Sequence, residues 1–207
     1  MNLKHLLKSV TVVLAVVFTT FSPLCAQTDK IDSLEKAIAG AGQDTVKARS
    51  LCRLCNQLRK RGRTDEALKV GEEGLGMARQ RKDAIGEADC LNNLGVVYEN
   101  QGDYGKAADC YSKALKINEK IGDKKGISDC LKNLGNVYSD QGDYGKAVDY
   151  LLKSLKINEE IGDKKGISDC LKNLGNVYGN QGDYGMATDY YIKALKIDEV
   201  IGYKSGT

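Results

Sequence analysis

The sequence predicts an all-α protein, a right-handed α-solenoid made of tandem antiparallel helix pairs. Three observations carry this prediction. The motif Asn-Leu-Gly-(Val/Asn)-Val-Tyr begins at Asn93, Asn133 and Asn173, so the chain repeats every 40 residues. Apolar residues within each repeat follow the helical period rather than the alternation of a strand. Glycine–aspartate pairs interrupt the apolar stripes at fixed positions, as expected where one helix ends and another begins.

The first element, residues 1–26, has the pattern of a secretory signal peptide. A basic start precedes an uncharged apolar run over 10–21, and Ala26 offers a small residue for cleavage. The run is shorter than the ~20 residues that cross a bilayer. We therefore expect an exported protein, periplasmic or extracytoplasmic, and tethered to a membrane if it is part of a longer protein. An uncleaved anchor and lipidation at Cys25 are the alternatives.

Residues 27–43 are predicted to form an N-terminal capping helix, because the first unit of a solenoid has no neighbour on its outer face. The repeat array then covers 44–207. Subtracting 40 places Leu51, Leu54 and Leu58 in register with the apolar residues of the next copy, so the array begins with a weakened repeat. The four predicted repeats are 44–83, 84–123, 124–163 and 164–203.

Each repeat is predicted to hold two antiparallel helices of about 16–18 residues. In the second repeat one apolar stripe covers 91–98 and another covers 107–117. Between them, Gly102 can adopt the left-handed conformation that ends a helix, and Asp103 can cap the helix that follows. The small residue Gly95 is expected to let the partner helix approach closely.

The array reaches Thr207 where another first helix is due, since 201–207 aligns with 161–167. No polar capping helix follows the apolar residues Ile192 and Leu195, so we expect an exposed apolar face. Two interpretations remain open. Either the chain is a fragment truncated within a longer array, or this face joins a partner or a second copy.

The composition argues against catalysis. Removing 1–26 takes Lys4, Lys8 and the only histidine, which leaves 29 basic residues (31 less 2) against 28 acidic ones. A nearly neutral chain has no electrostatic case for nucleic acid. Without histidine the commonest general base is missing. We therefore expect no enzyme, no catalytic residues, no cofactor, no metal and no small-molecule substrate.

Six cysteines follow residue 26, and we expect them to pack in the core rather than to form disulfides. Cys90, Cys130 and Cys170 occupy one repeat position, so they should lie about 10 Å apart, beyond the ~7 Å Cα limit for a bridge. Cys52 and Cys55 form a C-x-x-C pair, but no strand precedes it, as redox versions of the motif require, and a zinc site needs further ligands.

The repeat itself resembles the tetratricopeptide repeat. Its residues in the second copy are Leu91, Leu94, Gly95, Tyr98, Gly102, Ala107, Tyr111 and Ala114. Similar sets cover 131–154 and 171–194, with Leu151 and Ser154 as departures, and glutamate replaces the usual proline after the second helix. The 40-residue length is similar to Leu-Gly-Asn repeats and kinesin light chains. With the export signal, the chain also resembles the exported sensory region of bacterial signalling proteins.

This resemblance implies that the first helix of each repeat lines a concave groove that binds an extended peptide or protein segment. The groove residues it implies are polar: Asn92, Asn93, Asp129, Lys132, Asn133, Asn136, Asp169, Lys172, Asn173, Asn176 and Asn180, with Asp89, Val96, Asn100 and Asp140 at further groove positions. Asparagines would hold a peptide backbone and lysines would select an acidic group. Lys132, Asn136 and Asn173 match part of a carboxylate clamp, whose other basic residues would fall in a further repeat. The alternative is a solvated polar helix face.

The function expected is a non-enzymatic protein–protein interaction module, the sensory or scaffold part of a larger signalling protein. The alternative is a self-contained envelope adaptor or assembly factor that self-associates through its C-terminal face.

Overall fold

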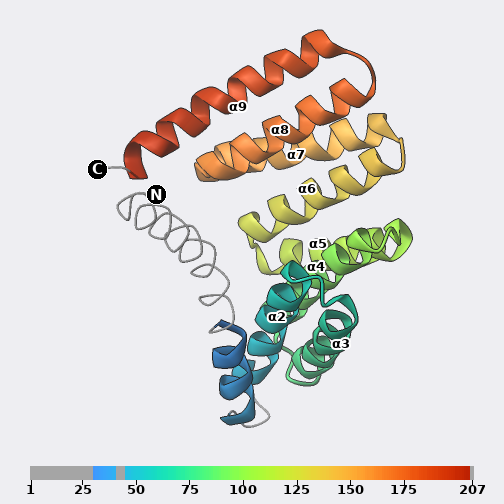
Figure 1. The fold of residues 1–207 in the computed structure, drawn as a ribbon, viewed down its shortest axis with the longest axis vertical. Coiled ribbons are helices and arrows are strands. Elements are labelled where there is room, and N and C mark those ends of the chain that lie inside the picture. The colour runs from blue at the N-terminus through green and yellow to red at the C-terminus, as the bar shows by residue number, and fades with distance from the viewer. Residues whose placement is uncertain (1–29, 41–44, 206–207) are drawn as a thin grey trace, which may run out of the picture.

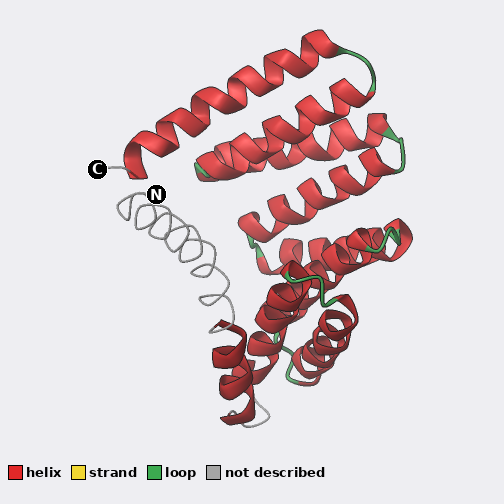
Figure 2. Cartoon of the chain, viewed as in Figure 1, coloured by secondary structure: helices red, strands yellow, loops and turns green. Residues whose placement is uncertain are grey.

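The computed structural model describes residues 30–40 and 45–205, and throughout these ranges the ordered elements are helices (Figure 2). The predicted signal peptide lies outside the described residues. A helix over 30–40 is followed by α2 (Thr45–Lys60), α3 (Thr64–Gln80), α4 (Ala84–Asn100), α5 (Tyr104–Ile121), α6 (Lys124–Asp140), α7 (Tyr144–Ile161), α8 (Lys164–Asn180) and α9 (Tyr184–Ser205). The prediction of an all-α solenoid of helix pairs is confirmed.

The helices stack in chain order, from the blue helix over 30–40 at one end to α9 at the other (Figure 1). Each pair (α2–α3, α4–α5, α6–α7 and α8–α9) is a hairpin, and the second helix of one pair packs on the first helix of the next. We call α2, α4, α6 and α8 the first helices, and α3, α5, α7 and α9 the second helices. The 16 to 18 residues of α2 to α8 match the predicted length.

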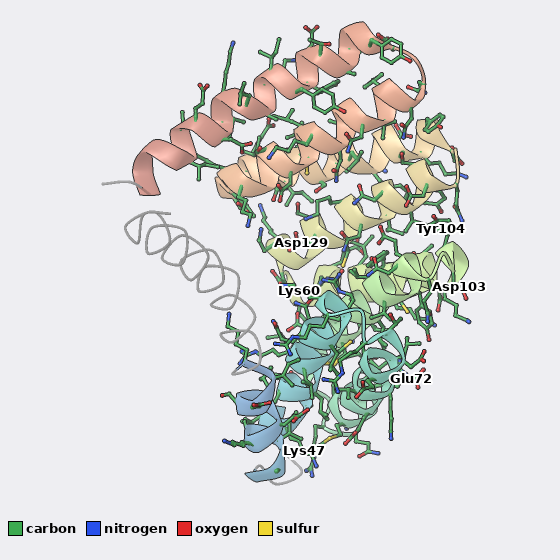
Figure 3. All side chains as sticks on the ribbon, in the orientation of Figure 1. Lys47, Lys60, Glu72, Asp103, Tyr104 and Asp129 are labelled. Carbon is green, nitrogen blue, oxygen red and sulfur yellow. A yellow bond between two sulfur atoms is a disulfide. The ribbon has the colours of Figure 1, made fainter. Side chains whose placement is uncertain are left out.

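Local chemistry sets the turns as predicted. Gly102 has φ of +76°, and the Asp103 carboxylate accepts a hydrogen bond from the Lys106 backbone N–H at 3.1 Å, which begins α5. Gly122, with φ of +75°, ends that helix. Figure 3 shows Asp103 at the turn between α4 and α5, on the side of the molecule opposite Asp129 near the start of α6.

The repeat glycine makes room for a side chain of the second helix. A Cβ atom built on Gly95 would lie 2.5 Å from the Tyr111 ring, and one on Gly175 would lie 2.6 Å from the Tyr191 ring. At Gly135 the neighbour is Leu151, at 2.7 Å. A substituent at the glycine position would therefore collide with the partner helix, which explains why the helix tolerates glycine despite its lower helical propensity.

The helix over 30–40 closes the outer side of the first pair. Its Ile31 is buried and packs in one apolar cluster with Leu54 and Leu58 of α2 and with Ala67 of α3. The core continues through the stack as a series of such clusters between hairpins. Burial is therefore shared between neighbouring units, as a solenoid requires.

One expectation about the cysteines is wrong. Cys52 of α2 and Cys90 of α4 form a disulfide, with their Cα atoms 5.1 Å apart and a sequence separation of 38. The argument from the repeat spacing covered only residues at one repeat position, and Cys52 does not share the position of Cys90. The remaining cysteines, Cys55, Cys110, Cys130 and Cys170, are free and buried as expected.

Candidate functional site

The first helices form the inner face of the solenoid. Neighbouring first helices contact one another, whereas among the described helices no two second helices do. The stack must therefore curve with α2, α4, α6 and α8 on its concave side. This is the face on which the predicted groove residues stand.

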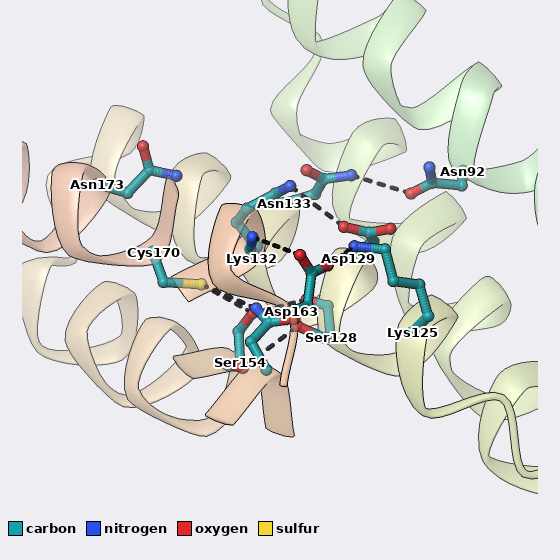
Figure 4. Close-up of polar contacts among 12 residues, drawn as sticks. Asn92, Lys125, Ser128, Asp129, Lys132, Asn133, Ser154, Asp163, Cys170 and Asn173 are labelled. Atoms are coloured by element: carbon teal, nitrogen blue, oxygen red, sulfur yellow. Dashed lines mark hydrogen bonds and ion pairs between the residues drawn. The ribbon is translucent and has the colours of Figure 1, made fainter. Parts of the chain in front are cut away.

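A ladder of asparagine side chains connects neighbouring first helices. The Asn93 amide donates to the Cys52 carbonyl oxygen at 3.0 Å, and the Asn133 amide donates to the Asn92 side-chain oxygen at 2.9 Å (Figure 4). One repeat further, Asn173 donates to Asn136 at 2.8 Å. Each of these bonds joins one repeat to the next. Each of the three repeated asparagines therefore uses one amide N–H to hold neighbouring repeats together.

The two predicted groove lysines already have acidic partners. Lys132 lies 3.2 Å from the Asp129 carboxylate (Figure 4), and Lys172 lies 2.7 Å from the Asp198 carboxylate. Hydrogen bonds from Lys172 and Ser168 hold the pKa of Asp198 below its usual range. Both lysines are therefore paired with carboxylates within the repeat array, Lys132 with one on its own helix and Lys172 with one on α9.

A cleft of about 640 Å³ lies at the α9 end of the inner face. It is lined by Glu99, Asn136, Ser139, Asp140, Asn173, Asn176, Val177, Gly179, Asn180, Tyr184, Ala187, Thr188 and Tyr191. Four of the predicted site residues meet here: Asn136, Asn173, Asn176 and Asn180. The Tyr191 hydroxyl donates to the Asn176 side-chain oxygen at 2.7 Å, which orients this amide within the cleft lining.

The other predicted site residues lie elsewhere on the inner face. Asn92 and Asn93 line a smaller cleft of about 330 Å³ with Arg49, Cys52, Arg53, Ile85 and Asp89. Neither of these clefts includes Asp129, Lys132, Asn133, Asp169 or Lys172. The eleven predicted groove residues therefore fall into three groups: four line the large cleft, two line the smaller cleft and five line neither.

Sequence reasoning missed Glu99, which lies at the last turn of α4. Its carboxylate accepts a hydrogen bond from the Tyr111 hydroxyl at 2.6 Å. Burial raises the pKa of Glu99, the Tyr111 hydrogen bond opposes this, and the nearby Asp140 charge raises it further. Burial also raises the pKa of Asp140.

The positions of Glu99 and Asp140 could have been found in the sequence by comparing the repeats for differences rather than for shared residues. Residues 117–142 and 157–182 are identical at 23 of 26 positions, and two of the three differences are Ser139/Gly179 and Asp140/Asn180. All four residues line the large cleft. Glu99 stands at the same repeat position as the first of these pairs. Two of the three differences between these segments therefore fall on residues that line the cleft.

The inner face offers groups that form hydrogen bonds and ion pairs. Amides, carboxylates and tyrosine hydroxyls line the large cleft, and lysines and arginines stand elsewhere on the face. The described residues contain no group of three His, Cys, Asp or Glu side chains placed to hold a metal ion.

Comparison with known proteins agrees with the architecture. A family model described as tetratricopeptide repeat matches residues 46–120 and 127–199. The 43 kDa receptor-associated protein of the synapse from Tetronarce californica is 33% identical over 78 residues, which is 38% of this chain and 19% of that protein.

Solved structures show the same fold at low sequence identity. BtubC (BKLC) from P. vanneervenii has a TM-score of 0.71 and 20% identity over 96% of this chain and 82% of its own. A putative kinesin light chain with nearly identical TPR-like repeats from Podosopora anserina has a TM-score of 0.65 and 15% identity, covering 87% of this chain and 90% of its own.

Proposed function

This chain belongs to the tetratricopeptide repeat family, a family of protein–protein interaction modules, and from this premise we propose that its inner face binds an extended protein or peptide segment. The observation that supports the proposal is the 640 Å³ cleft, which gathers four asparagines from α6 and α8 on the concave side. An extended segment presents N–H and C=O groups along its length, and a carboxamide can pair with either.

The available hydrogen-bonding groups favour the large cleft for this contact. Asn176 and Asn180 are exposed, and Asn136 and Asn173 each keep atoms that their mutual bond does not use. The lysines that were expected to select an acidic group are instead paired with Asp129 and Asp198. Recognition through the peptide backbone therefore fits this face better than recognition of a carboxylate.

We further propose that the module is exported and is part of a larger protein. The signal-peptide pattern of 1–26 supports export, and the lack of histidine after residue 26 supports a non-enzymatic role as the sensory or scaffold part of a larger signalling protein. Within 30–40 and 45–205, no helix is long and apolar enough to cross a membrane.

Filling the cleft tests the groove assignment. A fluorescein-labelled peptide, selected on the purified chain from a phage-displayed library of random dodecapeptides, is expected to bind the Asn180→Trp variant about tenfold more weakly or worse, because the indole occupies the cleft. The matched control is Leu152→Trp, at an exposed position of α7 that lies outside the cleft lining, and it is expected to leave the affinity unchanged. Equal affinity of both variants in fluorescence anisotropy, or failure to select any peptide, would contradict the proposal.

A second candidate function, self-association, is favoured by the surface of α9. Leu195 is 58% exposed and Ile192 is 46% exposed, whereas Leu115 and Leu155, at the repeat position of Leu195, are half-buried beside the next hairpin. An apolar face of this kind is the usual surface of contact between subunits. We propose a second copy of the chain as its occupant.

Sedimentation velocity tests this candidate. The chain is expected to sediment as a dimer at high micromolar concentration, and Leu195→Glu is expected to convert it to a monomer because the charge cannot be buried without a partner. Leu152→Glu places the same charge on an exposed leucine of α7 and should leave the dimer intact. A wild-type chain that stays monomeric at all concentrations rejects self-association.

A further inference from the structure

We propose that the large cleft selects a positively charged side chain, arginine or lysine, of the bound segment, with Glu99 and Asp140 as its counter-charges. This inference rests on the proposed function, because it names the chemistry of the segment that the inner face binds. It also reverses the expectation, drawn from the lysines of the groove, that an acidic group is selected.

The charge of the cleft has one sign. Glu99 and Asp140 are its charged lining residues, and none of the described residues that line it is a lysine or an arginine. Neither carboxylate belongs to an ion pair among the described residues, although many other acids of the chain do. The cleft therefore holds two carboxylates that the array itself leaves without a cationic partner.

The position of Glu99 makes this lack of a partner costly. Glu99 is half-buried, and its pKa is raised by burial and by the charge of Asp140. Arg59 is the cation that acts on it, and its influence is weaker than that of Asp140. Arg59 donates from Nη2 to the Asn56 side-chain oxygen at 2.9 Å, and its buried Nε has no hydrogen-bond partner among the described residues. A cation entering the cleft would pair with both acids and so favour their charged forms.

The remaining walls suit a long cationic side chain. Tyr191 packs its ring on Gly175 and is 41% exposed, and Tyr184 is 74% exposed at the start of α9. Aromatic faces accept the stem of an arginine or lysine and attract its charge. The Asn176 and Asn180 amides can hold the adjacent peptide backbone. The cleft thus combines two carboxylates, two tyrosine rings and several amides among its lining residues.

Differences between the repeats place the charge at one location. Asn100, Asp140 and Asn180 share a repeat position, and only the middle repeat carries an acid there. Glu99 is likewise the acid among Glu99, Ser139 and Gly179. The two acids, one from α4 and one from α6, thus make a single acidic cleft, and a bound segment would meet it in a single register.

Selection from the random dodecapeptide library tests the inference. Peptides enriched on the purified chain are expected to contain arginine or lysine at one position, and replacing that residue by its neutral analogue, citrulline or norleucine, is expected to weaken binding about tenfold. The variant Glu99→Gln/Asp140→Asn should bind the cationic and neutral peptides within about twofold of each other, since the charge-assisted bonds are gone.

The substitutions are chosen to keep the fold. In Glu99→Gln the new carboxamide retains an oxygen that can accept the Tyr111 hydroxyl, and asparagine already stands at positions 100 and 180. The matched control is Glu119→Gln/Glu159→Gln, which removes the same charge from two exposed sites on α5 and α7 and should preserve the cationic preference. Thermal unfolding by circular dichroism confirms that each variant is folded.

The outcomes separate the two proposals. Selected peptides that compete for the cleft but show no preference for arginine or lysine, or a preference that survives Glu99→Gln/Asp140→Asn, overturn the cationic site and leave groove binding intact. If the library yields no binder, the groove proposal fails and the cationic site fails with it.

Discussion

Replacing Tyr111 with alanine is expected to lower the free energy of unfolding by about 3–5 kcal/mol. The ring is fully buried and packs on Gly95 at the centre of a hairpin, and its hydroxyl donates to Glu99 at 2.6 Å. Truncation removes these contacts and leaves a cavity that the surrounding helices cannot close. Urea denaturation followed by circular dichroism measures the loss.

The repeat supplies a matched control for this prediction. Tyr191 stands two repeats later at the same position, packs on Gly175 in the same way, and is 41% exposed. Because its ring already contacts water, Tyr191→Ala is expected to cost less, about 1–2 kcal/mol. Equal losses for the two variants would show that the stack beyond α5 does not enclose Tyr111 as described.

Reduction of the Cys52–Cys90 disulfide is expected to lower the free energy of unfolding by about 2–4 kcal/mol, since the bridge closes a long loop in the unfolded chain. The measurement compares urea denaturation of the chain with and without dithiothreitol. Cys52→Ala is the control: Cys55, Cys110, Cys130 and Cys170 are free, so the reductant should not change its stability. Sensitivity of that variant to dithiothreitol would point to a different pairing.

The fold could be predicted from the sequence because its determinants are local and repeated. Asp103 caps α5 through a residue three positions along, and Gly102 takes a conformation that its own lack of a side chain permits. Neither feature depends on distant parts of the chain. Each such signal recurs every 40 residues, so the array was predicted from several independent copies.

The candidate site was less predictable because it depends on contacts between repeats. Periodicity places Asn133 and Asn173 on the inner face, but only the structure shows that their amides are bonded to Asn92 and Asn136. Glu99 was missed because no acid recurs at its repeat position. Cys52 and Cys90 were missed because the spacing argument compared only residues one period apart.

The connections between neighbouring first helices differ in strength along the array. A covalent bond joins α2 to α4, whereas hydrogen bonds such as Asn133–Asn92 and Asn173–Asn136 link α4 to α6 and α6 to α8. Resistance to bending should therefore be greatest between α2 and α4 and lower between the first helices that follow. Bound segments of different width would therefore be accommodated by a change in curvature between α4 and α8, while the spacing between α2 and α4 stays fixed.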